Sequence, residues 1–328
     1  MILDEKKIIS ATIGAVRTVK EGNGIGFRRF SEKQEIAFDG KKAYFGSDFE
    51  HYFYNNSLCS AGICLDFITD AKSVVIKAGG EPKNDKLPKI SCDILADGRR
   101  VKTQSGETVT VSFRNKKERR ITVYLSVGGR DCISEVELAD ADIFRPYYKQ
   151  GTDILFFGDS IFQGIGTRHA SCTMPTIVGR RLNARIMNQG NNGYVYDANT
   201  LDKICEPKLI VLGYGCNDRD RKSENDFYND ALAFAKKVRE LWKDIPAVGV
   251  LPVYCGADAE PDYIKWYRKC DDLLRKAYEE TNIAVINGQE LIPHDITYFN
   301  PDYHPNDKGY LIYGNRLAKR LVEMGLYK

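Results

Sequence analysis

Four short segments carry residues whose types could act together on an acyl group. The segment DILFFGDSIFQG puts Ser160 directly after an apolar run, at a predicted strand-to-helix turn. A helix N-terminus there would aim backbone N–H groups at a developing anion. A serine in this position can also simply cap the helix. The tripeptide Gly-Asp-Ser is therefore a weak signal by itself.

The other three segments also suggest chemistry. Gly193 lies in NQGNNGY, where a glycine lets a backbone N–H approach a ligand, and Asn217 lies in GYGCND, where its amide could donate to an oxyanion. His304, in YFNPDYHPNDKG, precedes the last predicted helix and could act as a base. The remaining histidines have no comparable context: His51, His169 and His294. Turn formation explains each motif alone, but together they supply the nucleophile, donors and base of acyl transfer.

The segments between these motifs predict the elements that hold them. After residue 150, apolar runs alternate with amphipathic helical stretches such as residues 223–242 and 261–281. Continuous apolar strands separated by helices indicate a parallel sheet covered on both faces. The five runs are DILFFG, ARIMNQG, KLIVLGYG, AVGVLPVY and IAVING. We expect a doubly wound α/β domain whose site lies beyond the carboxyl ends of its strands.

The pattern before this domain is different. From about residue 34 to residue 143, short segments that alternate apolar and polar residues, including KSVVIKA and RRITVYLSV, predict half-buried strands. The Asp-Gly dipeptides at 39–40 and 97–98 stand where such runs break and favour tight hairpin turns. We therefore predict an antiparallel β-sandwich, a jelly roll, over residues 1–149 and the α/β domain over residues 150–328.

Composition excludes several classes of function. Hydrophobic residues make up 43% and charged residues 28% of the chain, as in soluble globular proteins, and the formal net charge is only +3. Basic runs such as NKKERR are short, so no nucleic-acid footprint is visible. No apolar stretch is long enough for a membrane span, and MILDEKKIIS lacks the pattern of a signal peptide. We expect a cytoplasmic protein that binds neither nucleic acid nor membrane.

Cysteine and glycine patterns indicate no cofactor site. The nine cysteines are scattered without a close pair at zinc-ligand spacing, which predicts free thiols and no metal site. The stretch EGNGIGF has the glycines of a dinucleotide fingerprint without the flanking strand and helix, and we interpret it as a flexible loop. A phosphate-binding loop after the first α/β strand is disfavoured, because GDSIFQGIG holds an acid where a phosphate would lie.

Taken jointly, the motifs resemble those of the SGNH hydrolase superfamily, also called GDSL-type esterases. The resemblance covers residues 153–328 and rests on FFGDSI, NQGNNG, GYGCND and DYHP. It implies a flavodoxin-like fold in which Ser160 is the nucleophile and His304 the base. It also implies an oxyanion hole made by the backbone N–H groups of Ser160 and Gly193 and the side chain of Asn217. No metal or organic cofactor is implied.

The acid of the triad departs from the family pattern, in which an aspartate stands three residues before the histidine. That position is Pro301 here, whereas Asp302 is two residues before His304. An acid beside the second imidazole nitrogen fixes the tautomer and stabilises the imidazolium. We favour Asp302 for this role. The alternatives are a backbone carbonyl or another acid such as Asp295, and Asp302 could equally cap a turn.

A β-sandwich followed by an SGNH domain resembles the family-two carbohydrate esterases, which remove O-acetyl groups from plant-polysaccharide sugars. The resemblance implies an esterase that acts on small-molecule or oligosaccharide acetyl esters through an acyl-enzyme on Ser160. Tyr194 and Tyr214 adjoin the oxyanion motifs and could shape a small acyl pocket. Trp266, with the tyrosines at 263 and 267, could stack on a sugar ring, although aromatic residues at helical spacing more often belong to a core.

Other functions remain as alternatives. A non-catalytic carbohydrate-binding protein on an SGNH scaffold would bind sugars without releasing acetate, and the intact Ser160 and His304 argue against it. A short-chain lipase or acylhydrolase would use the same residues on another ester. No apolar insertion between the motifs indicates the lid of a long-chain lipase. The sequence leaves the oligomeric state open.

Overall fold

A computed structural model describes residues 1–41, 51–82, 91–219, 221–254 and 261–328. The chain divides into two compact units. The sandwich unit comprises Met1–Ser31, Asn55–Gly151 and His169–Ser171, and the α/β unit comprises Glu32–Tyr54, Thr152–Arg168 and Cys172–Lys328. Each unit is considered by itself.

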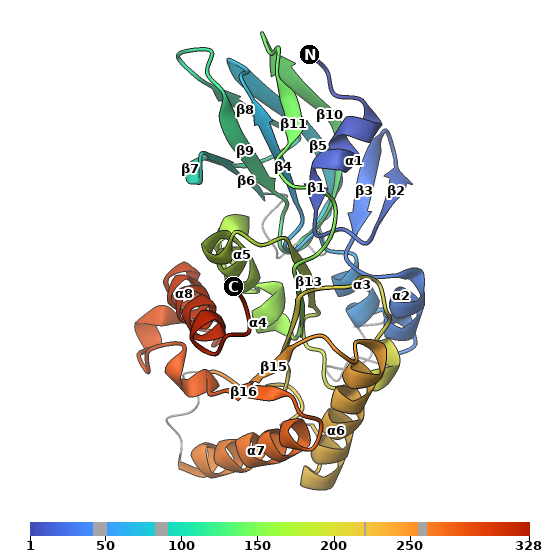
Figure 1. The fold of residues 1–328 in the computed structure, drawn as a ribbon, viewed down its shortest axis with the longest axis vertical. Coiled ribbons are helices and arrows are strands. Elements are labelled where there is room, and N and C mark those ends of the chain that lie inside the picture. Colours follow the sequence, from blue (N-terminus) through green and yellow to red (C-terminus); the bar gives the residue numbers. More distant parts are fainter. Residues whose placement is uncertain (42–50, 83–90, 220, 255–260) are drawn as a thin grey trace. The chain divides into compact units, whose positions relative to one another are not determined.

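The sandwich unit contains two antiparallel sheets (Figure 1). The first joins β1 (Thr12–Ile13), β4 (Cys64–Thr69), β9 (Arg119–Tyr124), β6 (Ser91–Ala96) and β7 (Arg99–Ser105) in that order, with β11 (Phe144–Pro146) paired to β4. The second has the order β2 (Arg17–Glu21), β3 (Gly24–Arg28), β10 (Gly129–Ala139), β5 (Ser73–Pro82) and β8 (Thr108–Ser112). The unit also contains the short helix α1 (Glu5–Ala11).

One hydrophobic core joins the two antiparallel sheets. Phe67 on β4 and Ile94 on β6 belong to the same buried cluster as Val74 on β5 and Val136 on β10. Strand β8 shows the period-two pattern most clearly, because its exposed and buried residues alternate from end to end. Burial of one face of each sheet against the other makes this unit a β-sandwich, as predicted. The jelly-roll connectivity stays a prediction.

The glycine-rich stretch EGNGIGF is not the flexible loop that its sequence suggested. It forms the tip and the second strand of the β2–β3 hairpin, where Glu21 pairs with Gly24 across a two-residue turn. Gly22 has a φ of +53°, which a glycine adopts without strain. The interpretation as a flexible loop was wrong because it considered only the strand and helix of a dinucleotide-binding motif. A short turn that contains glycine between two strands is instead a hairpin signal.

One of the two hairpin turns predicted at Asp-Gly dipeptides is present, and the other is not. Asp97 and Gly98 both have positive φ and connect β6 to β7, as a two-residue hairpin turn requires. The hairpin predicted at 39–40 is wrong, because Asp39 is the last residue of helix α2 (Glu32–Asp39). Local turn chemistry identified the one site that lies between two pairing strands.

The α/β unit is built on one five-stranded parallel sheet, as predicted. The strand order is β13 (Ile186–Gly190), β12 (Ile154–Gly158), β14 (Leu209–Gly213), β15 (Ala247–Val250) and β16 (Ala284–Ile286). Every residue of β12, β13, β14 and β15 is buried, which explains why β12, β14 and β15 are apolar runs without alternation. On β13 the buried polar side chains of Asn188 and Gln189 form hydrogen bonds. The order changes direction at β12 and β14, and such a switch point is where ligands bind in flavodoxin-like sheets.

Helices cover both faces of this sheet (Figure 1). Helices α5 (Met174–Leu182) and α8 (Asp307–Glu323) share a core cluster with residues of β12 and β14, including Phe156 and Val211. On the other face, Phe157 packs against Phe234 and Trp242 at α6 (Glu224–Leu241), beside α7 (Pro261–Glu279). The doubly wound α/β fold preceded by a β-sandwich is therefore confirmed.

The two units depart from the predicted domains, which assigned residues 1–149 and 150–328 to single stretches. The change of unit at Gly151–Thr152 lies beside that boundary, but Glu32–Tyr54 belongs with the α/β unit. In that segment the Gln34 amide donates to Gln189 Oε1 at 3.0 Å and to the Thr200 carbonyl at 2.9 Å. Helix α3 (Tyr52–Ser57) spans the next change of unit.

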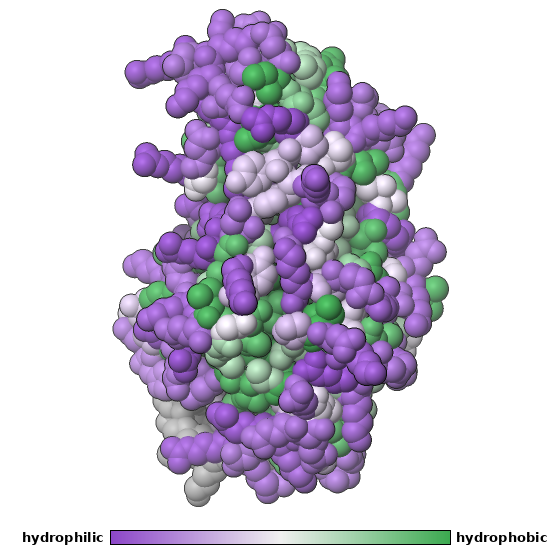
Figure 2. Space-filling view, in the orientation of Figure 1, coloured by the Kyte–Doolittle hydropathy of each residue, from purple (hydrophilic) through white to green (hydrophobic). Residues whose placement is uncertain are grey.

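Hydrophilic residues cover most of the face shown in Figure 2, and hydrophobic residues gather there in limited patches. Among the helices in the described ranges, none has the length and apolar character needed to cross a membrane.

Candidate functional site

Ser160 begins helix α4 (Ser160–Gln163), immediately after the buried central strand β12. Asp159 caps this helix, because its Oδ1 accepts the Ile161 N–H at 3.0 Å. The ring of Phe162 lies over Gly158, where a Cβ atom would stand 2.4 Å from the ring. Glycine is thus required for the sharp turn that presents the serine. The cap role considered for Ser160 belongs to Asp159.

His304 lies beside the serine. Its Nε2 is 2.9 Å from Ser160 Oγ, which is within hydrogen-bond distance. The histidine loop is closed by the Asn300 N–H, which donates to the His304 carbonyl at 2.8 Å, and Asn300 Nδ2 donates to the Gly166 carbonyl at 2.8 Å. Gly166 has a φ of +99°, and a Cβ there would stand 2.8 Å from the His304 Cβ. The loops after β12 and before α8 are therefore fitted closely together.

Asp302 is the acid nearest the imidazole. Its Oδ2 lies 3.2 Å from His304 Nδ1, and its Oδ1 accepts the His304 N–H at 3.3 Å. Tyr303, between them, has a φ of +65°, an uncommon conformation for a large side chain that turns the chain sharply between the two residues. The interaction with the His304 ring lowers the pKa of the Asp302 carboxyl below its ordinary value.

The contact between Asp302 and His304 Nδ1 is short, but it is not a well-directed hydrogen bond. His304 Nδ1 makes no well-directed hydrogen bond to any residue in the described part of the chain. The contact with Asp302 is therefore an ion pair with a side chain that is 62% exposed. Asp295, the alternative acid, instead caps a 3₁₀ turn, where its Oδ1 accepts the Thr297 N–H at 2.9 Å.

Three hydrogen-bond donors near the serine could bind an oxyanion. The N–H of Gly193, which is buried and has a φ of +75°, donates to no atom of the described residues. Ser160 is the first residue of α4, so its N–H has no acceptor inside the helix. Asn217 Nδ2 donates to the Tyr194 carbonyl at 3.1 Å, which leaves the second amide hydrogen for another acceptor.

The chain after Asn217 holds the loop that carries Gly193. Asp218 Oδ1 accepts the Tyr196 N–H at 3.0 Å, and Lys222 Nζ donates to the Tyr196 carbonyl at 3.1 Å. Lys222 also pairs with Asp218 at 2.8 Å. Arg221 Nη1 donates to the Gly193 carbonyl at 2.7 Å. Two loops that follow different strands are thus joined by side chain to backbone bonds.

Buried polar atoms without a hydrogen bond gather at the same loops. Within the described ranges these include Asp159 Oδ2, Asn191 Oδ1, Asp218 Oδ2 and His304 Nδ1. Burial raises the pKa of Asp159 to about 7, and it raises the pKa of Asp218 against the opposing effect of Lys222. Unsatisfied buried groups are few in native proteins, and their concentration beside shifted acids is typical of a functional site.

The rings of Tyr194 and Tyr214, predicted to shape an acyl pocket, are largely buried in the α/β unit. Tyr194 and Tyr214 are only 2% and 3% exposed. Tyr194 packs edge-on against Phe38 and Phe53 and donates to Asp197, while Tyr214 packs against Phe234. Both residues also line pockets of the α/β unit, so the predicted acyl pocket stays a prediction.

Of the aromatic residues on α7 that were predicted to stack on a sugar, only the side chain of Tyr267 is described. Tyr267 is 5% exposed and belongs to the interior. The side chains of Trp266 and Tyr263 lie outside the described residues.

Two residues that the sequence analysis did not single out contact the site loops. Gln163 is fully buried and accepts the Asn192 N–H at 2.8 Å, and Arg221 contacts Gly193 as described above. Gln163 stands one helical turn after Ser160, a spacing that places two side chains on one face of a helix. Arg221 had no comparable signal, because its distance in sequence from Gly193 gives no indication of contact.

No metal centre is assembled by the residues with described positions. Among them, no three His, Cys, Asp or Glu side chains come together as metal ligands. The cysteines with described positions are free thiols, and Cys255 lies outside the described ranges.

A family comparison now bears on this geometry. Residues 156–312 match the GDSL-like lipase/acylhydrolase family. The matched range contains Ser160, Gly193, Asn217 and His304. The chain contains a GDSL-like lipase/acylhydrolase domain. This assignment supports esterase or acylhydrolase activity, and the GDSL-like domain lies within the α/β unit.

Solved structures share the fold of the GDSL-like domain together with that of the sandwich. A protein from Bacteroides ovatus ATCC 8483 described as a GDSL-like lipase is 16% identical, with a TM-score of 0.78 over 100% of this chain and 98% of that one. The salicylyl-acyltransferase SsfX3 of a tetracycline biosynthetic pathway is 20% identical, with a TM-score of 0.70 over 96% and 94%. A family-two carbohydrate esterase from Cellvibrio japonicus is 14% identical, with a TM-score of 0.66 over 96% and 95%. No curated protein matches the sequence.

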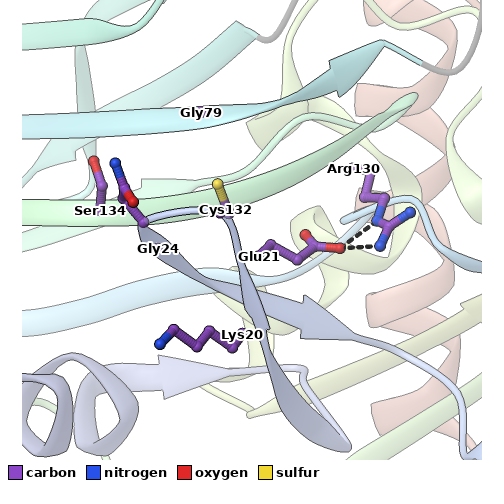
Figure 3. A pocket seen from close by; sticks show the side chains of 9 residues that line it. Lys20, Glu21, Gly24, Gly79, Arg130, Cys132 and Ser134 are labelled. Atoms are coloured by element: carbon purple, nitrogen blue, oxygen red, sulfur yellow. Dashed lines mark hydrogen bonds and ion pairs between the residues drawn. The ribbon is translucent and has the colours of Figure 1, made fainter.

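A cavity of about 570 Å³ in the sandwich unit contains none of these site residues. Figure 3 shows its lining, with Cys132 and Ser134 on β10 beside Gly79 on β5, and with Glu21 turned toward Arg130. Glu21 Oε1 accepts from Arg130 and, at 2.5 Å, from the buried Arg28. The charges of Glu21 and Arg130 at this cavity are therefore paired with one another.

Proposed function

We propose that the protein is a serine esterase that removes O-acetyl groups from oligosaccharides. The observation that carries the proposal is the 2.9 Å approach of His304 Nε2 to Ser160 Oγ beside the buried N–H of Gly193. A nucleophile, its base and unused donors are the parts that acyl transfer needs. The GDSL-like domain supports the reaction class.

The reaction begins with proton transfer. His304 Nε2 accepts the Ser160 hydroxyl proton while Oγ attacks the acetyl carbonyl carbon. The tetrahedral oxyanion accepts hydrogen bonds from the N–H groups of Ser160 and Gly193 and from Asn217 Nδ2. Collapse of this intermediate breaks the ester bond, and the imidazolium gives its proton to the leaving sugar oxygen. Water, activated by the same imidazole, then releases acetate and restores the serine.

Asp302 stabilises the imidazolium in this scheme. Its carboxylate lies 3.2 Å from Nδ1, so it favours the charged ring that forms when the serine proton is taken. Water screens an exposed ion pair, however, and the contribution is smaller than that of a buried triad acid. Asp302 therefore assists the reaction electrostatically, and Ser160 and His304 form a catalytic dyad.

The choice of an acetylated saccharide as substrate draws on solved structures with the same fold. Structures with the same fold include a family-two carbohydrate esterase from Cellvibrio japonicus and an acetyl xylan esterase from Butyrivibrio proteoclasticus. These likenesses are a reason to test acetylated xylo- and manno-oligosaccharides first. In the predicted cytoplasmic location, the substrates would be imported oligosaccharides. Another short-chain ester, hydrolysed by the same residues, is the second candidate because the GDSL-like domain belongs to a family of lipases and acylhydrolases.

The test uses purified full-length protein with acetylated xylo- and manno-oligosaccharides, p-nitrophenyl acetate and a long-chain p-nitrophenyl ester. Mass spectrometry follows the loss of acetyl groups, and the Ser160→Ala variant is the control. We expect acetate release from a saccharide, with little hydrolysis of the long-chain ester. Hydrolysis of p-nitrophenyl acetate alone would support the short-chain acylhydrolase. Equal activity of the alanine variant would remove Ser160 from the reaction.

A further inference from the structure

The Gly193 N–H belongs to a peptide group that lies between two anchored neighbours. Glycine itself imposes little preference on the orientation of this group, because it lacks a Cβ. Residue 193 has no side chain that could hold the N–H in place. The direction of the donor must therefore come from contacts made immediately before and after it.

Gln163 anchors the preceding peptide group. Its Oε1 accepts the Asn192 N–H at 2.8 Å, and its side chain is fully buried. The same residue ends the short helix that Ser160 begins. Strand β13 packs closely against this helix at Gly190, where a Cβ atom would lie 2.2 Å from the backbone nitrogen of Gln163. The anchor is thus fixed to the element that carries the serine.

Arg221 anchors the following peptide group. Its Nη1 donates to the Gly193 carbonyl at 2.7 Å. The next carbonyl, that of Tyr194, accepts from Asn217 Nδ2 at 3.1 Å. The backbone on both sides of the Gly193 N–H is therefore tied to the loops that carry the other two oxyanion donors.

We propose that Gln163 and Arg221 are positioning residues that hold the Gly193 N–H toward the oxyanion. The inference rests on the proposed serine esterase mechanism and deepens it. Neither side chain touches the reacting atoms. Gln163 sets the distance between the Ser160 and Gly193 donors, and Arg221 prevents the Gly193 peptide from rotating. A donor displaced by about 1 Å loses much of its effect on the transition state, at a cost of up to about 100-fold in rate.

The test replaces each anchor by an apolar side chain of similar length, in Gln163→Met and Arg221→Met. Arg221→Lys, which keeps a donor, is the conservative variant, and Arg181→Met, on the exposed face of α5, is the matched control. We measure kcat and KM for p-nitrophenyl acetate, the pH dependence of kcat/KM, and the Kd for phenylboronic acid. That probe forms a tetrahedral adduct with an activated serine.

We expect kcat to fall about 10-fold to 100-fold in both methionine variants, with KM changed less than about threefold. The Kd for phenylboronic acid should weaken by a similar factor, and the apparent pKa in the kcat/KM profile should not move. Arg221→Lys should recover part of the loss, and Arg181→Met should match the wild type. In an Asn217→Ala background the loss caused by Gln163→Met should shrink, because both changes affect one oxyanion.

Normal kcat in both methionine variants would overturn the inference. So would a loss of kcat with unchanged phenylboronic acid binding, because that pattern places the defect outside the oxyanion contacts. If Gln163→Met does not fold, as judged by circular dichroism, the partly exposed Arg221 decides the matter alone. Failure of the proposed function has a different signature: the wild type would not hydrolyse the ester, or Ser160→Ala would retain full activity.

Discussion

Buried charge is arranged differently in the sandwich cavity and in the catalytic loops. At the cavity, the Glu21 carboxylate lies between Arg28 and Arg130 and accepts from both. Beside Ser160, the acids Asp159 and Asp218 each keep one buried oxygen without a hydrogen bond. Loss of one partner of a buried ion pair destabilises a fold, whereas unpaired buried groups with shifted pKa values concentrate at functional sites. Buried polar groups without a hydrogen-bond partner therefore indicate the functional site better than cavity volume does.

The comparison predicts that changes to the reacting groups of the catalytic loops alter rate and that changes at the cavity alter stability. The sandwich is not free of exceptions, because Asp131 is buried there with one unpaired oxygen and burial raises its pKa to about 6. The distinction holds for the two charged clusters and can be tested at each of them.

The largest effect is expected for Ser160→Ala. Without the hydroxyl no acyl-enzyme forms, and kcat for p-nitrophenyl acetate should fall by about 10⁴-fold or more. Steady-state kinetics measures the loss, and thermal unfolding should show an unchanged Tm. Ser134→Ala at the sandwich cavity is the matched control and should retain full activity.

Asn217→Ala should have the next largest effect. Loss of one oxyanion donor costs about 100-fold to 1,000-fold in kcat, with a smaller change in KM. Because Asn217 Nδ2 also holds the Tyr194 carbonyl, the Tm reports any loosening of the loop. A kcat within fivefold of the wild type would remove Asn217 from the oxyanion hole.

Asp302→Asn should cost only about tenfold in kcat, far less than the roughly 10⁴-fold loss typical of a buried triad aspartate. The reason is the exposure of Asp302, whose effect on the imidazolium is screened by water. The same measurement at high salt should narrow the difference between variant and wild type. A loss as large as that of Ser160→Ala would show that Asp302 works as a buried triad acid does.

Glu21→Gln should leave kcat unchanged and destabilise the sandwich unit by about 2 kcal/mol. The substitution keeps the shape of the side chain but removes the charge that both arginines contact, and Arg28 is only 4% exposed. Denaturant unfolding followed by intrinsic fluorescence measures the change. A selective loss of kcat with normal stability would reverse the comparison between the two regions.

The smallest effect on rate is expected for Asp159→Asn, whose prediction concerns the pH dependence of stability. Burial raises the pKa of Asp159 to about 7 from an ordinary value of 3.8, so the folded protein keeps a proton that the unfolded chain has lost. Stability contributed by the protonated acid therefore falls as the pH rises from about 4 to 7. Asparagine caps a helix equally well and stays neutral.

The Asp159→Asn variant should thus have a higher Tm than the wild type at pH 8 and a smaller gain at pH 5. Differential scanning calorimetry at the two pH values measures the difference. An equal shift at both would indicate that Asp159 is ionised across this range.

Sequence patterns predicted the catalytic sheet because its strands other than β13 are continuous apolar runs. Ser160 and His304, far apart in the chain, could be expected to meet because the rule for parallel sheets brings loops at the strand ends together. The hydrogen bonds of Gln163 and Arg221 could not be expected, since nothing local distinguishes a side chain that binds a distant carbonyl. The burial of Tyr194 and Tyr214 was missed for a related reason: adjacency in sequence does not determine the direction of a side chain.

The N-terminal half was harder to divide. The hairpin at residues 21–24 was interpreted as a loop, and the segment Glu32–Tyr54 was assigned to the sandwich although it belongs to the α/β unit. Its membership depends on contacts such as that of Gln34 with Gln189, which link distant parts of the chain. Long-range pairing of this kind leaves no periodic signal in the sequence.

The central claim, that Ser160 carries the acyl group, is tested most directly by trapping the intermediate. The protein is mixed with p-nitrophenyl acetate, quenched in acid within the first turnover, digested and examined by tandem mass spectrometry. We predict an added acetyl group on Ser160 in the wild type and none on that peptide in Ser160→Ala. Acetylation at another residue during turnover, or hydrolysis that continues in Ser160→Ala, would contradict the account.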